Sequence, residues 1–287
     1  MLIDNISSFL KKNKIVLKKS LGQNFLNNHE TLDNLLTYIN PTEKDIFIEI
    51  GSGIGSLTFP LSRKVKKIYA VETDRNLLKI SEKLGEAFEN IEFINQDILK
   101  LGLEQFIKCK LRDGEKVRIT GNLPYYISTP ILFELLKVRK YVRDVIIMLQ
   151  KELAMRMLAH PGTRDYNALT VFLQLYTDIE LGFEVKRTCF YPQPKVDSTV
   201  VKIIPLARPR VDIDDSYLFE KIVKTCFAHK RKTLKNNLKK INGLTKNFNI
   251  IDSIFGELSM NPEIRAEDLS VFDFKRLYDI LIEKGLV

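Results

Sequence analysis

The sequence is poor in the residues that bind metals or form disulfide frameworks. Among its 287 residues there are three cysteines, three histidines and no tryptophan. The cysteines (Cys109, Cys189 and Cys226) are far apart, and no Cys-x-x-Cys pair occurs, so we expect neither a disulfide framework nor a zinc site. We predict no bound metal, and this cysteine usage is typical of a reducing compartment such as the cytoplasm.

Long apolar runs are also missing. No stretch approaches the roughly 18–20 apolar residues that a membrane-spanning helix needs. The first ten residues contain Asp4 and are followed by lysines, so they lack the apolar segment and the cleavage site of a secretory signal. We therefore expect a cytoplasmic protein with no membrane partner, and we expect a monomer because no dimerisation pattern is present.

Acidic residues are outnumbered by basic ones. The chain has 45 Lys and Arg against 36 Asp and Glu, a net charge of +9. This balance favours a polyanionic partner, nucleic acid before an acidic membrane surface, although a surface rich in lysine explains it equally well. Residues 1–20 hold five of the lysines and form a basic arm, which is either a solvated terminus or a phosphate contact.

Apolar patterns of strand and helix type alternate along the first half of the chain. Strands are predicted at residues 45–50, 67–72, 91–95, 116–120 and 143–149. Helices are predicted between them, at residues 29–39, 56–63, 75–87 and 128–139. This alternation indicates an α/β fold with a mostly parallel, doubly wound, Rossmann-like sheet.

The second half changes character after a linker. Helices are predicted at 151–159 and 166–176, and strands at 178–186 and 197–204. Residues 205–215 have the composition of a turn and linker, and only helical patterns follow. We therefore predict a catalytic domain over residues 1–207, including the basic arm, and a small all-α domain over residues 208–287.

A glycine-rich loop follows the first predicted strand. Gly51, Gly53 and Gly55 stand at alternate positions, which lets the backbone turn sharply and approach a ligand closely. Glu72 ends the second strand, where an acid can bind ribose hydroxyls, and Asp97 follows the third, where a carboxylate can accept from an adenine amine. The loop departs from the dinucleotide pattern and resembles those of class I methyltransferases, whose sulfonium cofactor needs no phosphate cradle.

The fourth predicted strand ends at Asn122-Leu123-Pro124-Tyr125, which resembles the Asn/Asp-Pro-Pro-Tyr signature of amino methyltransferases. An adenine N6 amine is a poor nucleophile because its lone pair is delocalised into the ring. The Asn122 side-chain oxygen and the Leu123 carbonyl can accept its two hydrogens and localise that lone pair. Pro124 stiffens the loop, and Tyr125 can stack on an extruded base. A plain proline turn is the competing interpretation.

With these motifs, the chain resembles the ribosomal RNA adenine dimethyltransferase family over nearly its whole length. Residues 18–26 read Lys-Lys-Ser-Leu-Gly-Gln-Asn-Phe-Leu and resemble the family's N-terminal motif. The resemblance implies S-adenosylmethionine as the cofactor, with contacts from Asn24, Leu26, Gly51, Glu72, Asp97 and Asn122. Residues 190–198 read Phe-Tyr-Pro-Gln-Pro-Lys-Val-Asp-Ser and resemble a second family segment, which implies that Phe190 and Tyr125 sandwich the base. Position 126 is tyrosine where several members carry asparagine.

The C-terminal part contains a basic run without acids from Lys221 to Ile251. Its segment Lys230-Arg231-Lys232-Thr233-Leu234-Lys235 resembles a further family segment, and Lys and Arg at helical spacing would form a phosphate-binding stripe. Leu234 and Leu238 would then face inward. A solvated basic helix is the alternative. The resemblance implies dimethylation of two adjacent adenosines in the 3′-terminal hairpin loop of small-subunit (16S) rRNA, within an immature small subunit.

Three other functions compete with this one. The erythromycin-resistance branch methylates a large-subunit rRNA adenine, but the Asn-Leu-Pro loop and the segment 190–198 favour the small-subunit branch. A DNA adenine methyltransferase would need a target-recognition insertion, which is not apparent. A non-catalytic assembly checkpoint, or a transcription factor as among mitochondrial relatives, would not need the intact loop from Asn122 to Tyr125.

Overall fold

The computed structural model describes residues 6–13, 15–18, 21–241 and 248–287. Its chain forms two compact units: residues 1–154 with 179–205, and residues 155–178 with 206–287. The predicted boundary after residue 207 is close to residue 205, where the chain leaves the first unit for the last time. Residues 155–178, which were predicted in the first domain, group with the C-terminal helices. Within the described residues, no helix has both the length and the apolar character needed to cross a membrane.

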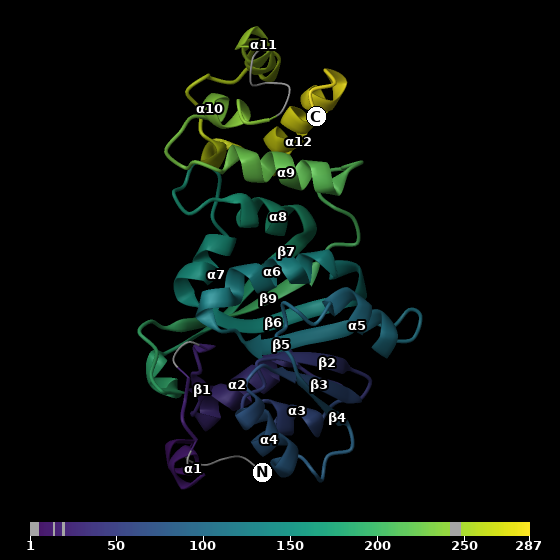
Figure 1. Cartoon of the computed structure of the whole chain (residues 1–287), viewed down its shortest axis with the longest axis vertical. Helices are drawn as coiled ribbons and strands as arrows, with labels where there is room; N and C mark the ends of the chain where they lie inside the picture. The colour runs from purple at the N-terminus through teal and green to yellow at the C-terminus, as the bar shows by residue number, and fades with distance from the viewer. Residues whose placement is uncertain (1–5, 14, 19–20, 242–247) are drawn as a thin grey trace. The chain divides into compact units, whose positions relative to one another are not determined.

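The first unit is built on a sheet that has seven strands among the described residues, in the order β4-β3-β2-β5-β6-β9-β7 (Figure 1). The strands β4, β3, β2, β5 and β6 are parallel, and β9 pairs with β6 in the antiparallel sense. Their bounds are β2 (Ile46–Ile50), β3 (Lys67–Glu72), β4 (Ile91–Asn95), β5 (Val117–Asn122), β6 (Val142–Gln150), β7 (Thr177–Val185) and β9 (Ser198–Pro205). This arrangement confirms the predicted mostly parallel α/β fold.

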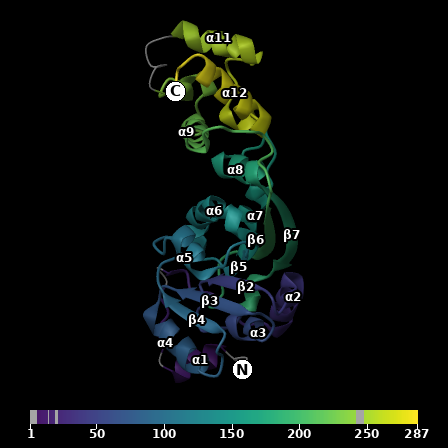
Figure 2. The same cartoon turned by 90° about the vertical axis from the view of Figure 1, so that its right-hand side faces the viewer.

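Helices cover both faces of this sheet, with α2 and α3 on one face and α5 and α6 on the other (Figure 2). The helices are α2 (His29–Ile39), α3 (Thr58–Ser62), α4 (Arg75–Leu84), α5 (Leu103–Lys110), α6 (Ser128–Lys137) and α7 (Lys151–Met157). The strand β2 is buried along its whole length because it has helices on both faces. From β2 the chain adds β3 and β4 on one side and β5 on the other, and a crevice opens at such a switch point in α/β sheets.

The N-terminal segment is not a free arm in the part that is described. The helix α1 (Ile6–Lys12) buries Ile6 and Leu10 in a cluster with Phe25, Ile54 and Leu77. The short strand β1 (Phe25–Leu26) then pairs with β8 (Phe190–Tyr191) in the antiparallel sense. The predicted phosphate contacts of the arm remain a prediction, and its Lys14, Lys19 and Ser20 lie outside the described residues.

The second unit is helical, as predicted for the chain beyond the linker. Its helices are α8 (Ala168–Tyr176), α9 (Ser216–Cys226), α10 (Leu234–Leu238), α11 (Phe248–Leu258) and α12 (Val271–Glu283). Asp215 caps α9 by accepting from the Leu218 N–H, and Ser270 forms a capping box with Asp273 at the start of α12. Fully buried Phe219 and Phe274 contribute to the core of this unit.

Candidate active site

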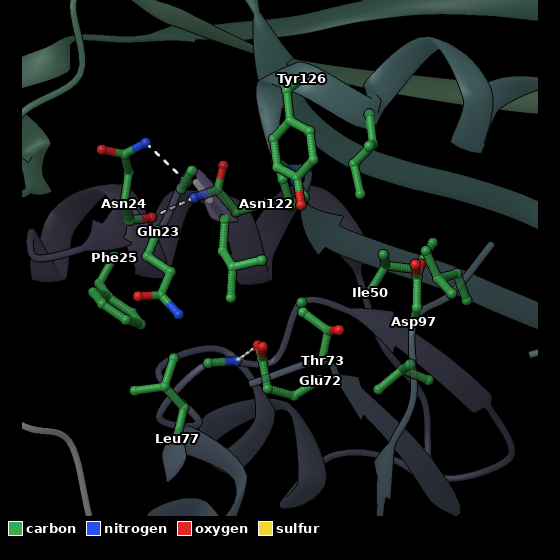
Figure 3. A pocket seen from close by; sticks show the side chains of 18 of the residues that line it. Gln23, Asn24, Phe25, Ile50, Glu72, Thr73, Leu77, Asp97, Asn122 and Tyr126 are labelled. Carbon is green, nitrogen blue, oxygen red and sulfur yellow. Dashed lines mark hydrogen bonds between the residues drawn. The ribbon is translucent and has the colours of Figure 1, made fainter. Parts of the chain in front are cut away.

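An open pocket lies at the carboxyl ends of β2, β3, β4 and β5 (Figure 3). This main pocket has an empty volume of about 700 Å³, its open mouth included. It brings together most of the predicted cofactor residues, namely Asn24, Gly51, Gly53, Glu72, Asp97 and Asn122, with Pro124 of the catalytic loop. Leu26, Leu123, Tyr125 and Phe190 do not line it.

The glycine loop approaches its neighbours too closely for a side chain. Gly53 has a φ of +58°, and a Cβ atom there would lie 2.8 Å from the Phe25 ring. Its N–H donates to the Glu72 Oε2 atom at 2.9 Å, while the Gly51 N–H donates to the Val71 carbonyl at 2.9 Å. These bonds fix the loop against the end of β3, so its backbone forms one wall of the pocket.

Two carboxylates face this wall from the ends of β3 and β4. Glu72 is buried, and its Oε1 atom also accepts from the Asp74 N–H at 2.7 Å. Burial raises the pKa of Glu72, and the N–H groups of Asp74 and Gly53 oppose part of that increase. The Asp97 Oδ1 atom accepts from the Leu99 N–H at 3.0 Å, which orients that carboxylate at the pocket.

The side chain of Asn122 is held by one end only. Its Nδ2 atom donates to the Asn24 carbonyl at 2.7 Å (Figure 3). Its Oδ1 atom is buried and accepts no hydrogen bond from the residues that the structure describes. The N-terminal segment therefore fixes the Asn122 amide so that one oxygen acceptor at the pocket is left unused.

The rest of the catalytic loop is anchored to the sheet and to a distant motif. The Leu123 N–H donates to the Met148 carbonyl at 2.9 Å, and Pro124 has a φ of −58°. The Tyr125 hydroxyl lies 2.8 Å from the Ser198 Oγ atom. The two segments that sequence comparison singled out independently, 122–125 and 190–198, therefore meet in the folded chain.

Phe190 does not face an open space in this structure. Its side chain is 4% exposed, and it belongs to the core cluster against which Leu26 packs. A base sandwiched between Phe190 and Tyr125 requires the Phe190 ring to leave this packing. The sandwich therefore stays a prediction.

The pocket also contains Tyr126, which the sequence marked as a departure from the family pattern, and Gln23, which the sequence patterns did not single out. Tyr126 lines the pocket, and its side chain is 55% exposed. Its ring lies against Gly22, because a Cβ atom added to Gly22 would be 3.5 Å from the ring. Gln23 lines the pocket too, and its Nε2 atom donates to the Asp74 Oδ2 atom at 2.9 Å. The signal for Gln23 was its place inside the 18–26 motif, next to the predicted Asn24.

The basic segment of the second unit differs from the predicted helical stripe. Lys230, Arg231 and Lys232 are exposed in a turn that precedes α10, because Thr233 caps that helix by accepting from the Asn236 N–H. Among the described residues these three cations have no ion pair, whereas Lys235 pairs with Asp252. Helical spacing was therefore wrong for the three cations, but the inward orientation of Leu234 and Leu238 is confirmed, because both side chains are fully buried.

Comparison with known proteins places this geometry in a family. A family model described as ribosomal RNA adenine dimethylase matches residues 15–282. The ribosomal RNA small subunit methyltransferase A of Bacillus cytotoxicus is 40% identical over 266 residues, which cover 92% of this chain and 91% of the relative. The protein of the same name from Bacillus mycoides has the same identity and the same coverage.

Solved structures agree with this placement. A dimethyladenosine transferase from Plasmodium falciparum is similar with a TM-score of 0.71 and 29% identity, over 91% of this chain and 98% of that one. The 23S rRNA methyltransferase ErmE shares the fold, with a TM-score of 0.63 and 21% identity over 90% of this chain and 99% of that one. With the family model and the curated relatives, the chain belongs to the ribosomal RNA adenine dimethylase family and is an rRNA adenine methyltransferase.

Proposed function

We propose that this chain uses S-adenosylmethionine to dimethylate the N6 amines of two adjacent adenosines in the 3′-terminal hairpin loop of small-subunit rRNA. The observation that carries the proposal is the unused Asn122 Oδ1 atom, which is fixed beside a pocket that fits the cofactor. The substrate is an immature small ribosomal subunit, so the reaction takes place in the cytoplasm, and the enzyme acts as a monomer.

The residues of the main pocket suit this cofactor. Glu72 can accept from ribose hydroxyls through lone pairs that its two backbone partners leave free, and Asp97 can accept from the adenine amine. Gly51 and Gly53 line the pocket without a side chain, so a ligand can approach their backbone. When bound, S-adenosylmethionine supplies an electrophilic methyl group.

The catalytic loop prepares the nucleophile. The Asn122 Oδ1 atom and the Leu123 carbonyl accept the two hydrogens of the target amine, which localises the nitrogen lone pair toward the methyl group. Pro124 keeps both acceptors oriented, and Tyr125 stacks on the base. The rate enhancement comes chiefly from this positioning. The proton leaves after methyl transfer, so no strong base is needed.

The exposed turn at Lys230, Arg231 and Lys232 supports binding of rRNA by the second unit. Structured RNA is recognised largely through its shape and its phosphates, while loop bases are splayed out for chemistry. The three cations of this turn have no ion pair with the residues that the structure describes, so they can contact phosphates, whereas Lys235 contributes less because Asp252 neutralises part of its charge.

The variant Asn122→Ala tests the catalytic role. Transfer to small subunits should fall by about 100-fold or more, the size of effect seen when one oriented hydrogen-bonding group is removed from an active site. Affinity for S-adenosylhomocysteine, measured by calorimetry, should change only a few-fold. Asn13→Ala, an exposed asparagine outside the pocket, is the matched control. Full transfer by Asn122→Ala would refute the role, and loss of folding would identify the loop as a structural turn.

A further inference from the structure

An exposed aromatic side chain stands at the start of α12 in the second unit. Phe272 is 60% exposed, whereas Val271 and Phe274 on the same turn are buried. The capping box of Ser270 and Asp273 fixes the helical turn that carries the ring. A single exposed apolar side chain is common on protein surfaces and indicates nothing by itself. The surroundings of Phe272 therefore decide whether the ring has a role.

The basic turn, residues 230–232, is held beside the start of α12 (Figure 1). The ring centroids of Phe227 and Phe274 lie 5.7 Å apart, so the end of α9 contacts the first turns of α12. The Leu234 N–H donates to the Ile264 carbonyl at 2.8 Å, which ties the start of α10 to the segment before α12. These two contacts flank the basic turn in the sequence, so they position it next to that helix start.

Two further contacts bring cations to the same surface. Lys230 and Lys232 line a small pocket together with Glu267, which belongs to the segment that leads directly into α12. The Glu267 carbonyl accepts from the Gly162 N–H at 2.8 Å, so a loop before α8 reaches this place too. Arg164 of that loop is exposed and forms no ion pair within the described part of the chain. Cations from two segments therefore gather around the start of α12.

The acids near the start of α12 have partners within the chain. The Asp268 Oδ2 atom accepts from the Arg265 N–H at 2.9 Å, and the Asp273 Oδ2 atom accepts from the Ser270 N–H at 3.0 Å. The Glu267 carboxylate lies 3.8 Å from the Arg265 guanidinium group. The surface thus combines available positive charge with an exposed aromatic ring. This combination fits single-stranded nucleic acid, whose phosphates bind lysine and arginine while its unpaired bases stack on aromatic rings.

We propose that Phe272 stacks on an unpaired base of the small-subunit rRNA while the basic turn contacts the phosphates beside that base. The inference rests on the proposed function, which makes rRNA the partner of the second unit. It adds a base contact in this unit to the one that the catalytic loop of the first unit makes with the target adenosine. Because every base has a flat aromatic face, the ring recognises an unpaired nucleotide rather than a sequence.

The first test uses the lack of tryptophan in the chain. Phe272→Trp places a single indole at the site, and its fluorescence should be quenched by a short oligoadenylate. An abasic strand of the same length has the same phosphates but no bases, so it should not quench. Tyr217→Trp is the matched control, because Tyr217 is 78% exposed at the opposite end of α9 and directly follows acids. Equal quenching by both strands, or none by oligoadenylate, would overturn the inference.

The second test measures affinity for unmodified small subunits and for protein-free small-subunit rRNA. Phe272→Ala should weaken binding to both by about tenfold, the usual loss when a stacked base loses its aromatic partner. The slope of log affinity against log salt should stay unchanged, because no phosphate contact is removed. Phe272→Tyr should bind like the wild type, whereas Phe272→Leu should bind as weakly as Phe272→Ala. Tyr217→Ala should have no effect.

The outcomes separate this inference from its alternatives. Weaker binding to subunits but not to protein-free rRNA would assign the ring to a ribosomal protein and overturn the inference. Wild-type affinity of Phe272→Leu would overturn it as well, because any apolar side chain would then suffice. If Phe272→Ala binds like the wild type and the wild type still dimethylates the subunit, this inference alone fails. If the wild type binds no small-subunit rRNA, the proposed function fails with it.

Discussion

The buried Glu49 carboxyl should make the ligand-free chain less stable as the pH rises. In the unfolded chain this group ionises near its ordinary pKa of 4.5, but in the folded chain it stays protonated until about pH 8. The folded state therefore holds a proton that the unfolded state has lost. The stabilising effect is complete below pH 4.5, and it is lost progressively as the pH rises toward 8.

The size of this effect follows from the linkage relation. One pKa unit corresponds to about 1.4 kcal/mol. Between pH 4.5 and pH 7 the contribution of Glu49 to the free energy of unfolding therefore falls by about 3 kcal/mol. Glutamine does not titrate, so Glu49→Gln removes the pH dependence of this one site. The free energy of unfolding of Glu49→Gln, relative to wild type, should therefore increase by about 3 kcal/mol between pH 4.5 and pH 7.

Urea unfolding followed by circular dichroism measures the effect, since the chain has no tryptophan to serve as a fluorescent probe. The relevant transition is that of the first unit, which contains Glu49. Glu89→Gln is the matched control, because Glu89 is exposed and should leave the pH profile unchanged. Parallel pH profiles for wild type and Glu49→Gln would refute the reasoning, because they would mean that Glu49 titrates normally.

Three further predictions follow from other parts of the chain. Replacing Lys230, Arg231 and Lys232 by Gln should weaken rRNA binding and reduce the slope of log affinity against log salt by about 2, because the variant neutralises fewer phosphates. The same replacement at the exposed first-unit lysines Lys44, Lys64 and Lys116 should leave the slope unchanged. An unaltered slope in the first variant would exclude this turn from the interface. Tyr125→Phe removes the 2.8 Å contact with Ser198, so it should lower kcat several-fold without changing cofactor affinity, and Ser198→Ala should reproduce it; unequal effects would mean that the hydroxyl acts elsewhere. Arg118→Ala should destabilise the first unit by about 3 kcal/mol, because it removes the buried arginine that pairs with Asp45 and Asp144 and leaves them the half-exposed Arg143; urea unfolding would contradict this if the loss were under about 1 kcal/mol.

The sequence predicted the parts of the fold that repeat a simple physical pattern. The five parallel strands were found because each is a short apolar run bounded by polar residues or glycine. The two-residue strands β1 and β8 were missed, because a contact between Leu26 and Phe190 depends on folding rather than on local pattern. The helix α5 was also missed, because its apolar stripe is short and lies between charged residues.

The candidate site was predictable where residues follow strands at one sheet edge. Glu72, Asp97 and Asn122 meet at the main pocket because the carboxyl ends of parallel strands lie side by side. The unused acceptor of Asn122 was not predictable, because it depends on a bond to the Asn24 carbonyl, far away in the chain. The burial of Glu49 was not predictable for a similar reason, since it appears only in three dimensions.

The central claim is most directly tested by mapping the modified nucleotides. The purified chain would be incubated with labelled S-adenosylmethionine and with small or large ribosomal subunits that lack the modification, and the rRNA would be analysed by mass spectrometry. We predict N6,N6-dimethyladenosine at two adjacent positions in the 3′-terminal hairpin loop of small-subunit rRNA. Label confined to large-subunit rRNA, or no label on either subunit, would contradict the account.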